Sequence, residues 1–333
     1  MRLTSREKEI IEFLKKEPLI SQDELAHRFG ITRSSVAVHI SNLMKKGVIL
    51  GKGYVFNEQS SIAVIGESSM RIMINNQGEK TDIDVDYGGF AIQISKVFAD
   101  LGVSVKLLSM VGNDDVGLVL LDRLQKNGID IKNIYRHSKK RSCRKVFLNN
   151  KAAFEECFSM QDYEKAIESR EWVAFNCEWL VIEPQFQELL YNRALSRNEG
   201  KVPYLCTCKH LSDSEEIPEF LAQYSSVVLG IEQPDKMDSY LNAVLSLVEN
   251  GTQNCILTDG HSRLMYFSKQ GVTDFPLLPN QCFNSRNSLP ALLAGLIYGL
   301  SCGYPLRQAV RIGIGTVAAN ESKKAKDLKR QAR

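Results

Sequence analysis

The chain has 333 residues, of which 44% are hydrophobic and 24% charged, a composition typical of a globular protein with room for a small domain and a large one. No apolar run approaches the roughly 18 residues that a membrane helix requires, and the charged residues Arg2, Arg6 and Glu7 exclude a typical secretory leader. We therefore expect a cytoplasmic protein without a membrane partner. Its formal net charge is +3.

Residues 3–56 have the pattern of three short helices followed by a β-ribbon. Pro18 ends the first helix, Ser21 and Glu24 form a capping box for the second, and Thr32 caps the third after a turn at Gly30. The apolar residues expected on the inner faces are Ile10, Ile11, Leu14, Leu25, Phe29, Val36, Ile40 and Leu43. The glycine-rich run 47–56 alternates in the manner of a small wing.

The outward face of the third helix is polar, as in a helix that reads the major groove. Its expected DNA contacts, together with a phosphate contact from the wing, are Arg33, Ser34, Ser35, Val38, Ser41, Lys45 and Lys52. The segment, with its core I-T-R-S-S-V-x-x-H-I-x-x-L, resembles the winged helix-turn-helix modules of bacterial regulators. We therefore predict a domain over 1–57 that binds double-stranded DNA; the alternative is a module used only for dimerisation or docking.

From residue 58 on, apolar strands alternate with helical stretches. The expected strands are 62–66, 105–108, 179–182, 204–206, 226–229 and 255–258, with a helix over 91–101. Such alternation predicts an α/β domain with a mostly parallel sheet that is covered by helices on both faces.

The motifs of this region resemble those of the ribokinase-like, or pfkB-type, carbohydrate kinases. The matching runs are Y-G-G-F-A-I-Q at 87–93, V-G-N-D-D-V-G at 111–117 and G-Y-P-L-R-Q-A at 303–309. The resemblance implies a doubly wound domain over 58–320 with a small β lid formed near 72–85 and 143–157, and a homodimer that pairs through this lid. A basic C-terminal tail, 321–333, would follow.

The run 284–290 departs from the family at the positions that carry the chemistry. In the family it reads D-T-x-G-A-G-D; the glycine-flanked amides hold the transition-state charge, and the last Asp takes the proton of the acceptor hydroxyl. Here Asn287, Ser288 and Leu289 stand at the anion hole and Pro290 at the base. Proline has no proton-accepting side chain, so the resemblance predicts a degenerate site without catalytic residues.

The sugar-binding positions are altered as well. An Asp that accepts hydrogen bonds from sugar hydroxyls is replaced by Arg71, whose guanidinium only donates. The ligand positions implied by the resemblance are Arg71, Gly88, Gly89, Phe90, Gln93 and Arg286. Arg71 and Arg286 suggest a phosphorylated effector, with a surface residue or an internal ion pair as the alternative for each.

The nucleotide-binding positions are partly retained. The N-x-x-E motif that organises magnesium aligns with Glu232 and Asp235, for which an exposed acidic loop is the alternative. The T-x-G motif persists at Thr258 and Gly260. These positions alone do not predict a cofactor. ATP and Mg²⁺ are expected only if the domain is an active kinase.

Eight cysteines occur without a C-x-x-C pair or zinc-finger spacing, and we expect reduced, mostly buried thiols and no metal site.

These observations lead to one main hypothesis, a transcription regulator whose degenerate kinase-like domain senses a sugar, a nucleoside or a phosphorylated derivative. The first alternative is an active sugar or nucleoside kinase, pseudouridine-like in its substrate, that would need Glu232, Asp235 or Asp259 as a substitute base. The second is a kinase-like body that serves only as a dimerisation scaffold.

Overall fold

The computed structural model describes residues 4–17, 20–45, 49, 62–77, 80–149, 151–195, 202–212 and 215–331. Three helices form the N-terminal unit: α1 (Ser5–Lys16), α2 (Gln22–Phe29) and α3 (Arg33–Lys45). They enclose a core of their own, which consists of Ile10, Leu14, Leu25, Ala26, Val36, Ile40, Leu43 and Ile49.

The predicted caps of α2 and α3 are present, whereas Pro18, the predicted stop of the first helix, lies outside the described residues. Ser21 and Glu24 form the capping box of α2, and the Thr32 hydroxyl accepts a hydrogen bond from the Ser35 amide at the start of α3. Gly30 ends α2 with a φ of 62°, a left-handed conformation that favours glycine. A second capping box, Thr4 with Glu7, opens α1. Apart from Ile49, the predicted wing and Lys52 lie outside the described residues.

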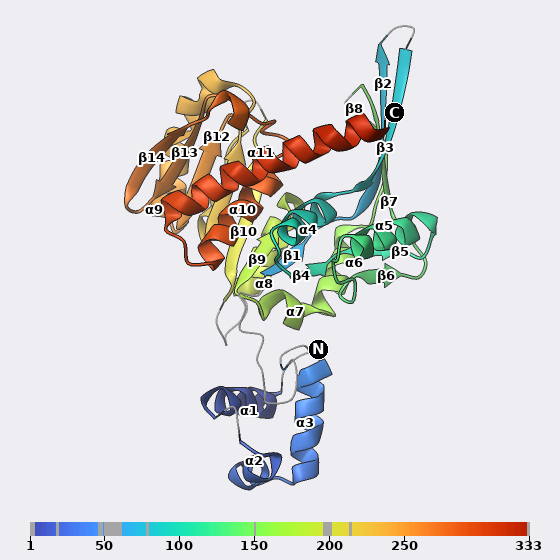
Figure 1. Cartoon of the computed structure of the whole chain (residues 1–333), viewed down its shortest axis with the longest axis vertical. Helices are drawn as coiled ribbons and strands as arrows, with labels where there is room; N and C mark the ends of the chain where they lie inside the picture. Colours follow the sequence, from blue (N-terminus) through green and yellow to red (C-terminus); the bar gives the residue numbers. More distant parts are fainter. Residues whose placement is uncertain are drawn as a thin grey trace.

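The large domain is organised around an eight-stranded sheet with the order β14-β13-β12-β11-β10-β9-β1-β4 (Figure 1). Its strands are β1 (Ile62–Ile65), β4 (Val105–Leu108), β9 (Trp179–Ile182), β10 (Tyr204–His210), β11 (Ser226–Gly230), β12 (Asn254–Thr258), β13 (Arg263–Ser268) and β14 (Gly271–Pro276). Strands β4 to β12 of this order pair in parallel, and β13 and β14 add an antiparallel edge. All strands predicted for this domain are confirmed.

Helices cover both faces of the sheet because the strands are apolar on both sides. One core contains Ile62 and Val64 of β1 and residues of α4 (Phe90–Asp100), α5 (Asp115–Lys126), α10 (Leu289–Ser301) and α11 (Leu306–Gln331). The other contains Ala63 and Ile65 and residues of α6 (Met160–Glu168), α7 (Glu171–Phe175), α8 (Gln187–Leu195) and α9 (Leu241–Glu249). Among the described helices, none is long and apolar enough to cross a bilayer.

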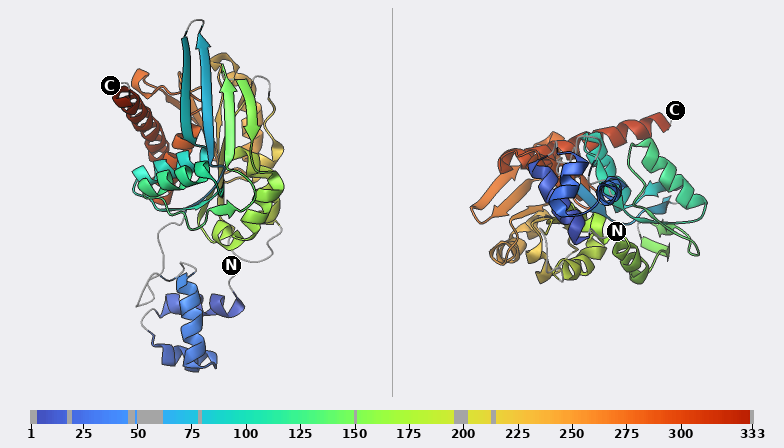
Figure 2. Two further views of the ribbon diagram at one scale, coloured as in Figure 1. Left: turned by 90° about the vertical axis from the view of Figure 1, so that its right-hand side faces the viewer. Right: turned by 90° about the horizontal axis from the view of Figure 1, so that it is seen from below.

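A second sheet, which we call the lid sheet, projects from the large domain (Figure 2). Its order is β3-β2-β7-β8, with β2 (Ser69–Gln77), β3 (Lys80–Gly88), β7 (Cys143–Leu148) and β8 (Lys151–Glu156). A short pair, β5 (Met110–Gly112) and β6 (Tyr135–His137), lies between β4 and β7 along the chain. The lid sheet occupies the segments that the family resemblance implied for a lid.

Two expectations differ from the structure. Cys143 and Cys157 form a disulfide across β7 and β8, so the expectation of uniformly reduced thiols is wrong for this pair. Their spacing of 14 residues gave no signal, because the hairpin that joins them is what brings them together. Residues 321–331, expected as a separate tail, continue α11 as helix.

Candidate functional site

The candidate ligand-binding region lies at the carboxyl ends of the parallel strands of the large sheet. The parallel strands β1, β9, β11 and β12 all end there, and they are followed by Glu67, Glu183, Glu232 and Asp259 respectively. The carboxyl ends of parallel strands are the usual place for ligands in doubly wound domains. The topology thus brings together residues that are far apart in the sequence.

In the loop before α10, backbone amides donate hydrogen bonds to Asn284 of the same loop. The Asn284 side-chain oxygen accepts hydrogen bonds from the amides of Arg286 and Asn287 at 2.9 and 3.0 Å, and the Asn284 carbonyl accepts one from the Ser288 amide at 3.0 Å. Ser285 fixes the loop further by donating to the carbonyl of Ile231. The amides of Asn287 and Ser288, two of the three expected at an anion hole, are therefore already paired within the loop.

The first turn of α10 is closed as well. Leu289 and Pro290 are buried, so the residue that the family resemblance places at the base position lies in the protein interior. The Ser288 hydroxyl donates at 2.6 Å to the carboxylate of Glu321 on α11, which puts an acidic group at the N-terminus of α10. Because helix N-termini attract anions, this carboxylate stands where a phosphate would otherwise be favoured.

The start of α4 lies next to this loop and to β1. Gln93 donates from its side-chain amide to the Asn287 carbonyl at 2.9 Å. Gly89 has a φ of +97°, and a Cβ atom there would lie 2.5 Å from the Glu67 carbonyl, so glycine is required at this position. Phe90 is half-buried, and a Cβ atom placed on Gly66 would lie 2.8 Å from its ring and 3.1 Å from the Glu183 carboxylate. Gly88, Gly89, Phe90 and Gln93 are thus brought together near the two glutamates.

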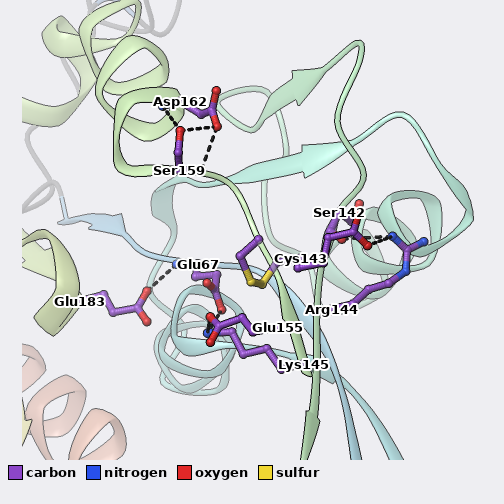
Figure 3. The surroundings of a disulfide bond; sticks show 11 residues. Glu67, Ser142, Cys143, Arg144, Lys145, Glu155, Ser159, Asp162 and Glu183 are labelled. Atoms are coloured by element: carbon purple, nitrogen blue, oxygen red, sulfur yellow. Dashed lines mark hydrogen bonds and ion pairs between the residues drawn. A yellow bond between two sulfur atoms is a disulfide. The ribbon is translucent and has the colours of Figure 1, made fainter. Parts of the chain in front are cut away.

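The centre of the candidate site is acidic and was missed in the sequence (Figure 3). Glu183 accepts a hydrogen bond from the Glu67 amide, and the Glu67 carboxylate pairs with Lys145 of the lid sheet at 3.0 Å. Lys145 also pairs with Glu155 at 3.0 Å. Burial, with the charge of Glu67 adding to it, raises the pKa of Glu183 to about 7. Burial alone lowers the pKa of Lys145, but the two neighbouring carboxylates outweigh it and raise that pKa.

Arg71 and Arg286, expected as cationic ligand residues, each have a partner. Arg71 pairs with Asp86 at 2.7 Å across β2 and β3, and Arg286 pairs with Glu232 at 3.4 Å between two exposed side chains. Of the alternatives considered, Arg71 has the ion pair within the protein, whereas Arg286 is a surface residue whose ion pair is exposed. In register, Asp86, Arg71, Lys145 and Glu155 form one charged row across the lid sheet.

The nucleotide-side positions show a compact turn. Asp259 is fully buried and accepts hydrogen bonds from the amides of His261 and Ser262 and from the Ser262 hydroxyl. Burial alone raises the pKa of Asp259, but these hydrogen bonds outweigh it and lower the pKa, so Asp259 is a poor proton acceptor. Within this turn, the Gly260 amide donates a hydrogen bond to the Thr258 hydroxyl.

The acidic loop of the aligned N-x-x-E motif is open to solvent. Glu232 and Asp235 are both exposed, which agrees with the exposed-loop alternative for the magnesium motif.

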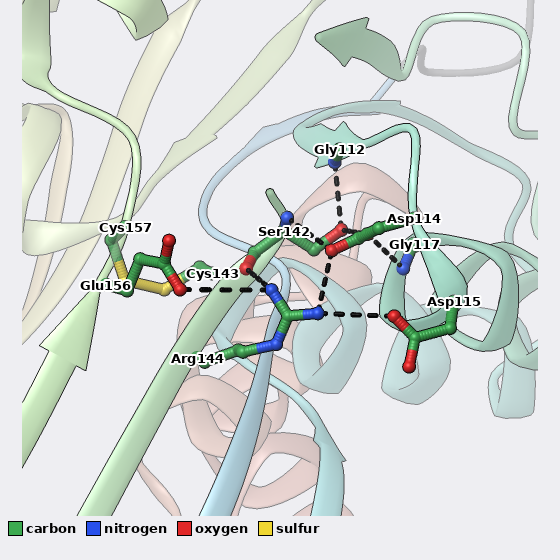
Figure 4. A network of polar contacts seen from close by, with 9 residues as sticks. All are labelled: Gly112, Asp114, Asp115, Gly117, Ser142, Cys143, Arg144, Glu156 and Cys157. Atoms are coloured by element: carbon green, nitrogen blue, oxygen red, sulfur yellow. Dashed lines mark hydrogen bonds and ion pairs between the residues drawn. A yellow bond between two sulfur atoms is a disulfide. The ribbon is translucent and has the colours of Figure 1, made fainter. Parts of the chain in front are cut away.

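A polar network fixes the base of the lid sheet (Figure 4). Asp114 caps α5 by accepting from the Gly117 amide, and it also binds the Ser142 hydroxyl at 2.6 Å and Arg144 at 2.8 Å. Burial alone raises the pKa of Asp114, but these bonds outweigh it and hold that pKa below its ordinary value. The start of β7 is therefore anchored to the body on one side, next to Cys143.

The candidate DNA-binding surface lies on α3. Arg33, Ser34, Ser41 and Lys45 are exposed, and Val38 is 58% exposed. Ser35 is half-buried and its hydroxyl bonds to Thr32, so it belongs to the helix cap. Arg33 lies 3.6 Å from Asp23 of α2. The face opposite the small core is therefore polar and accessible.

Comparison with known proteins agrees with both parts of the chain. Residues 3–49 match the winged helix-turn-helix DNA-binding family, and residues 59–184 match the pfkB family of carbohydrate kinases. The second match includes Glu67 and Glu183 but ends before the altered loop at 284–290.

One curated relative is similar over nearly its whole length. The uncharacterized sugar kinase YeiI of Escherichia coli (strain K12) is 27% identical over 361 aligned positions, which cover 96% of this chain and 94% of that protein.

Two solved structures show the same fold. The ribokinase of Thermotoga maritima is similar with a TM-score of 0.60 at 16% identity, covering 78% of this chain and 91% of that chain. The nucleoside kinase of Burkholderia thailandensis, in complex with inosine, has a TM-score of 0.58 at 13% identity and covers 78% and 90%. The predicted ribokinase-like fold is confirmed.

Proposed function

The chain combines a winged helix-turn-helix domain with a pfkB-type carbohydrate kinase domain, and from this we propose that it is a transcription regulator whose kinase-like domain binds a small molecule without phosphorylating it. The observation that carries the proposal is the closed loop before α10. Its amides are bonded to Asn284, its base position is a buried proline, and the Glu321 carboxylate stands at the helix N-terminus. Each of these features opposes stabilisation of a transferring phosphoryl group.

The chemistry of the sheet edge suggests the ligand class. The carboxylates of Glu67 and Glu183 accept hydrogen bonds, and Lys145 between Glu67 and Glu155 donates them. Such a set suits the hydroxyl groups of a sugar or nucleoside. Arg71 and Arg286 are paired with carboxylates, so the phosphorylated derivative is the less favoured member of the class.

A homodimer would couple ligand binding to DNA binding. The face of the lid sheet opposite the charged row exposes Ile83, Val85, Leu148 and Phe154, at 65, 42, 46 and 52% of their surfaces. A second copy of the chain would cover these side chains. A ligand that binds beneath the lid would then bias the dimer geometry, and with it the spacing of two α3 helices on DNA.

DNA binding is tested first, by fluorescence anisotropy with a duplex selected by the protein from a random library. Arg33→Ala should lower the affinity for the selected duplex by about tenfold or more, because one base contact contributes about 1–3 kcal/mol. The matched control Lys132→Ala, a cation 85% exposed on the large domain, should leave the affinity unchanged. Equal affinities for wild type and Arg33→Ala would contradict DNA reading by α3.

The sensor is tested by screening pentoses, hexoses and nucleosides for a change in DNA affinity. A ligand that changes it should lose its effect in Glu183→Gln and keep it in Glu188→Gln, which alters an exposed glutamate of α8. A DNA affinity that no compound changes would favour the scaffold alternative.

The alternative is an active sugar or nucleoside kinase, and the similarity to a protein named as a sugar kinase favours it. It predicts that Mg-ATP binds and that ADP is released with one of the screened compounds. We expect neither, and we expect Pro290→Asp to release no ADP because the amides and Glu321 still close the loop. ADP release by the wild type would overturn the proposed loss of phosphotransfer while leaving the DNA measurement unaffected.

A further inference from the structure

At the base of the lid sheet, the two cysteines of the disulfide lie beside a carboxylate. The sulfur atoms of Cys143 and Cys157 and an oxygen of Glu67 all lie within 4.8 Å of one another. Cys143 and Glu67 are buried and Cys157 is half-buried, and the three come from different segments of the chain (Figure 3). The proposed regulator mechanism gives the two cysteines no role, and it uses Glu67 only as a hydrogen-bond acceptor.

We propose that, once the disulfide is reduced, Cys143, Cys157 and Glu67 form a binding site for a thiophilic divalent cation such as Zn²⁺. Two thiolates and a carboxylate are ordinary zinc ligands, and a water molecule completes a tetrahedral set. Bonds of about 2.0–2.3 Å place tetrahedral ligands roughly 3.3–3.8 Å apart, so only side-chain adjustments are needed once the sulfurs separate. The disulfide is the oxidised, metal-free state of the same site.

The interconversion is a balanced exchange. A small dithiol reduces the disulfide and becomes a disulfide itself, which leaves two protein thiols. Zn²⁺ then displaces the two thiol protons into the buffer, and each sulfur forms a bond to the metal. A small-molecule disulfide reverses the process: it accepts two electrons from the protein thiols and releases the metal.

The surrounding charges suit both states. Two thiolates, one carboxylate and Zn²⁺ together carry one negative charge, and Lys145, 3.0 Å from Glu67, supplies the compensating positive charge. In the oxidised state the same ammonium group neutralises Glu67. Lys145 also lies on the same face of β7 as Cys143, two residues away.

The other described free cysteines are less suited to form the proposed metal site. Burial raises the pKa of the Cys206 and Cys208 thiols, which lie within the core of the large sheet. Cys282 and Cys302 are exposed and are removed in the test to prevent adventitious binding.

Metal binding would change how the lid is held. The disulfide joins β7 to the end of β8, both within the lid sheet, whereas the metal would also join them to Glu67, which follows β1 of the large domain. The reduced, zinc-bound state would therefore tether the lid to the body and withdraw Glu67 from any ligand. This consequence rests on the proposed function, but the metal site itself does not.

The test uses the full chain with Cys282→Ser and Cys302→Ser as background. After reduction with a phosphine, anaerobic titration with Co²⁺ should give thiolate-to-cobalt charge-transfer absorption with one ion per chain, and Zn²⁺ should abolish it. The disulfide form should give no such absorption until it is reduced. Glu67→Gln should weaken Co²⁺ binding by about tenfold or more, since a ligand is lost.

Cys157→Ser, at the less buried of the two positions, should lose the charge-transfer absorption while keeping the far-UV circular dichroism and DNA affinity of the background protein. If it unfolds, Cys157→Ala replaces it with the same expected result. The proposal is overturned if the reduced background protein gives no thiolate absorption, or if the absorption persists at full intensity without Cys157.

Discussion

Single residues decide what the candidate site can do chemically. Pro290, which the family resemblance places at the base position, is buried, and its side chain has no proton-accepting group. Glu321 brings a negative charge to the N-terminus of α10 through Ser288. Glu183 behaves differently, because its carboxyl group retains a pKa of about 7 at the edge of the sheet. A carboxyl group with a raised pKa is therefore present on the proposed ligand side, whereas Pro290 supplies no such group.

The raised pKa of Glu183 predicts a pH-dependent stability. Its folded pKa of about 7 lies above the unfolded value of roughly 4.3, so between these values the folded state binds more protons. The free energy of unfolding should thus decrease as the pH rises through this window and level off above it.

Glu183→Gln should remove this contribution. Relative to wild type, the variant should become more stable from about pH 5 to pH 7, by at most a few kcal/mol, because one pKa unit corresponds to about 1.4 kcal/mol. Urea unfolding at several pH values measures the difference, with Glu188→Gln as the control. A constant difference between Glu183→Gln and wild type would show that Glu183 is not perturbed.

At the scale of elements, the loop before α10 is a self-contained unit. Asn284 binds the amides that follow it, Ser285 ties the loop to β11, and Gln93 ties it to α4. Hydrogen bonds within the loop, to the carbonyl of Ile231 after β11 and from Gln93 of α4 therefore fix its conformation.

Asn284→Ala should therefore destabilise the protein. Two backbone hydrogen bonds to the side chain are lost, at about 0.5–1.5 kcal/mol each, so the free energy of unfolding should fall by about 1–3 kcal/mol. Urea unfolding measures this, and Asn250→Ala, at the exposed C-terminus of α9, serves as the control. If both variants match the wild type, the side chain of Asn284 does not hold the loop.

At the scale of the whole molecule, the two faces of the lid sheet have different surroundings. The charged row meets Glu67 of the large domain through Lys145, whereas the opposite face leaves Ile83 and Phe154 more than half exposed. This division follows from strand geometry, because successive side chains point to opposite faces.

Ile83→Lys should prevent the proposed dimer, since a desolvated lysine in an apolar interface is unfavourable. Light scattering after size-exclusion chromatography should give the mass of one chain, and DNA affinity should fall because two linked α3 helices bind more tightly than one. Leu118→Lys, at a residue of α5 that is equally 65% exposed, should remain a dimer. A monomeric wild type would refute pairing through the lid.

Much of this protein is determined by local patterns in its sequence. The caps at Ser21 and Thr32, the apolar stripe of α3 and the alternation of strands and helices are properties of short segments, so they could be predicted residue by residue. The family resemblance likewise predicts, from the aligned motif alone, that Pro290 replaces the catalytic base.

Only the tertiary structure decided how distant residues meet. The Glu67 amide and Glu183 carboxylate are 116 residues apart, and Ser288 and Glu321 are 33 apart. Their contacts depend on the path of the chain between them, which periodicity does not specify. Glu67 and Glu183 did have a sequence signal, since each directly follows a predicted strand, 62–66 and 179–182. The partners of Arg71 and Arg286, the disulfide and the paired amides of the loop required the fold, because side-chain chemistry depends on neighbours that folding brings together.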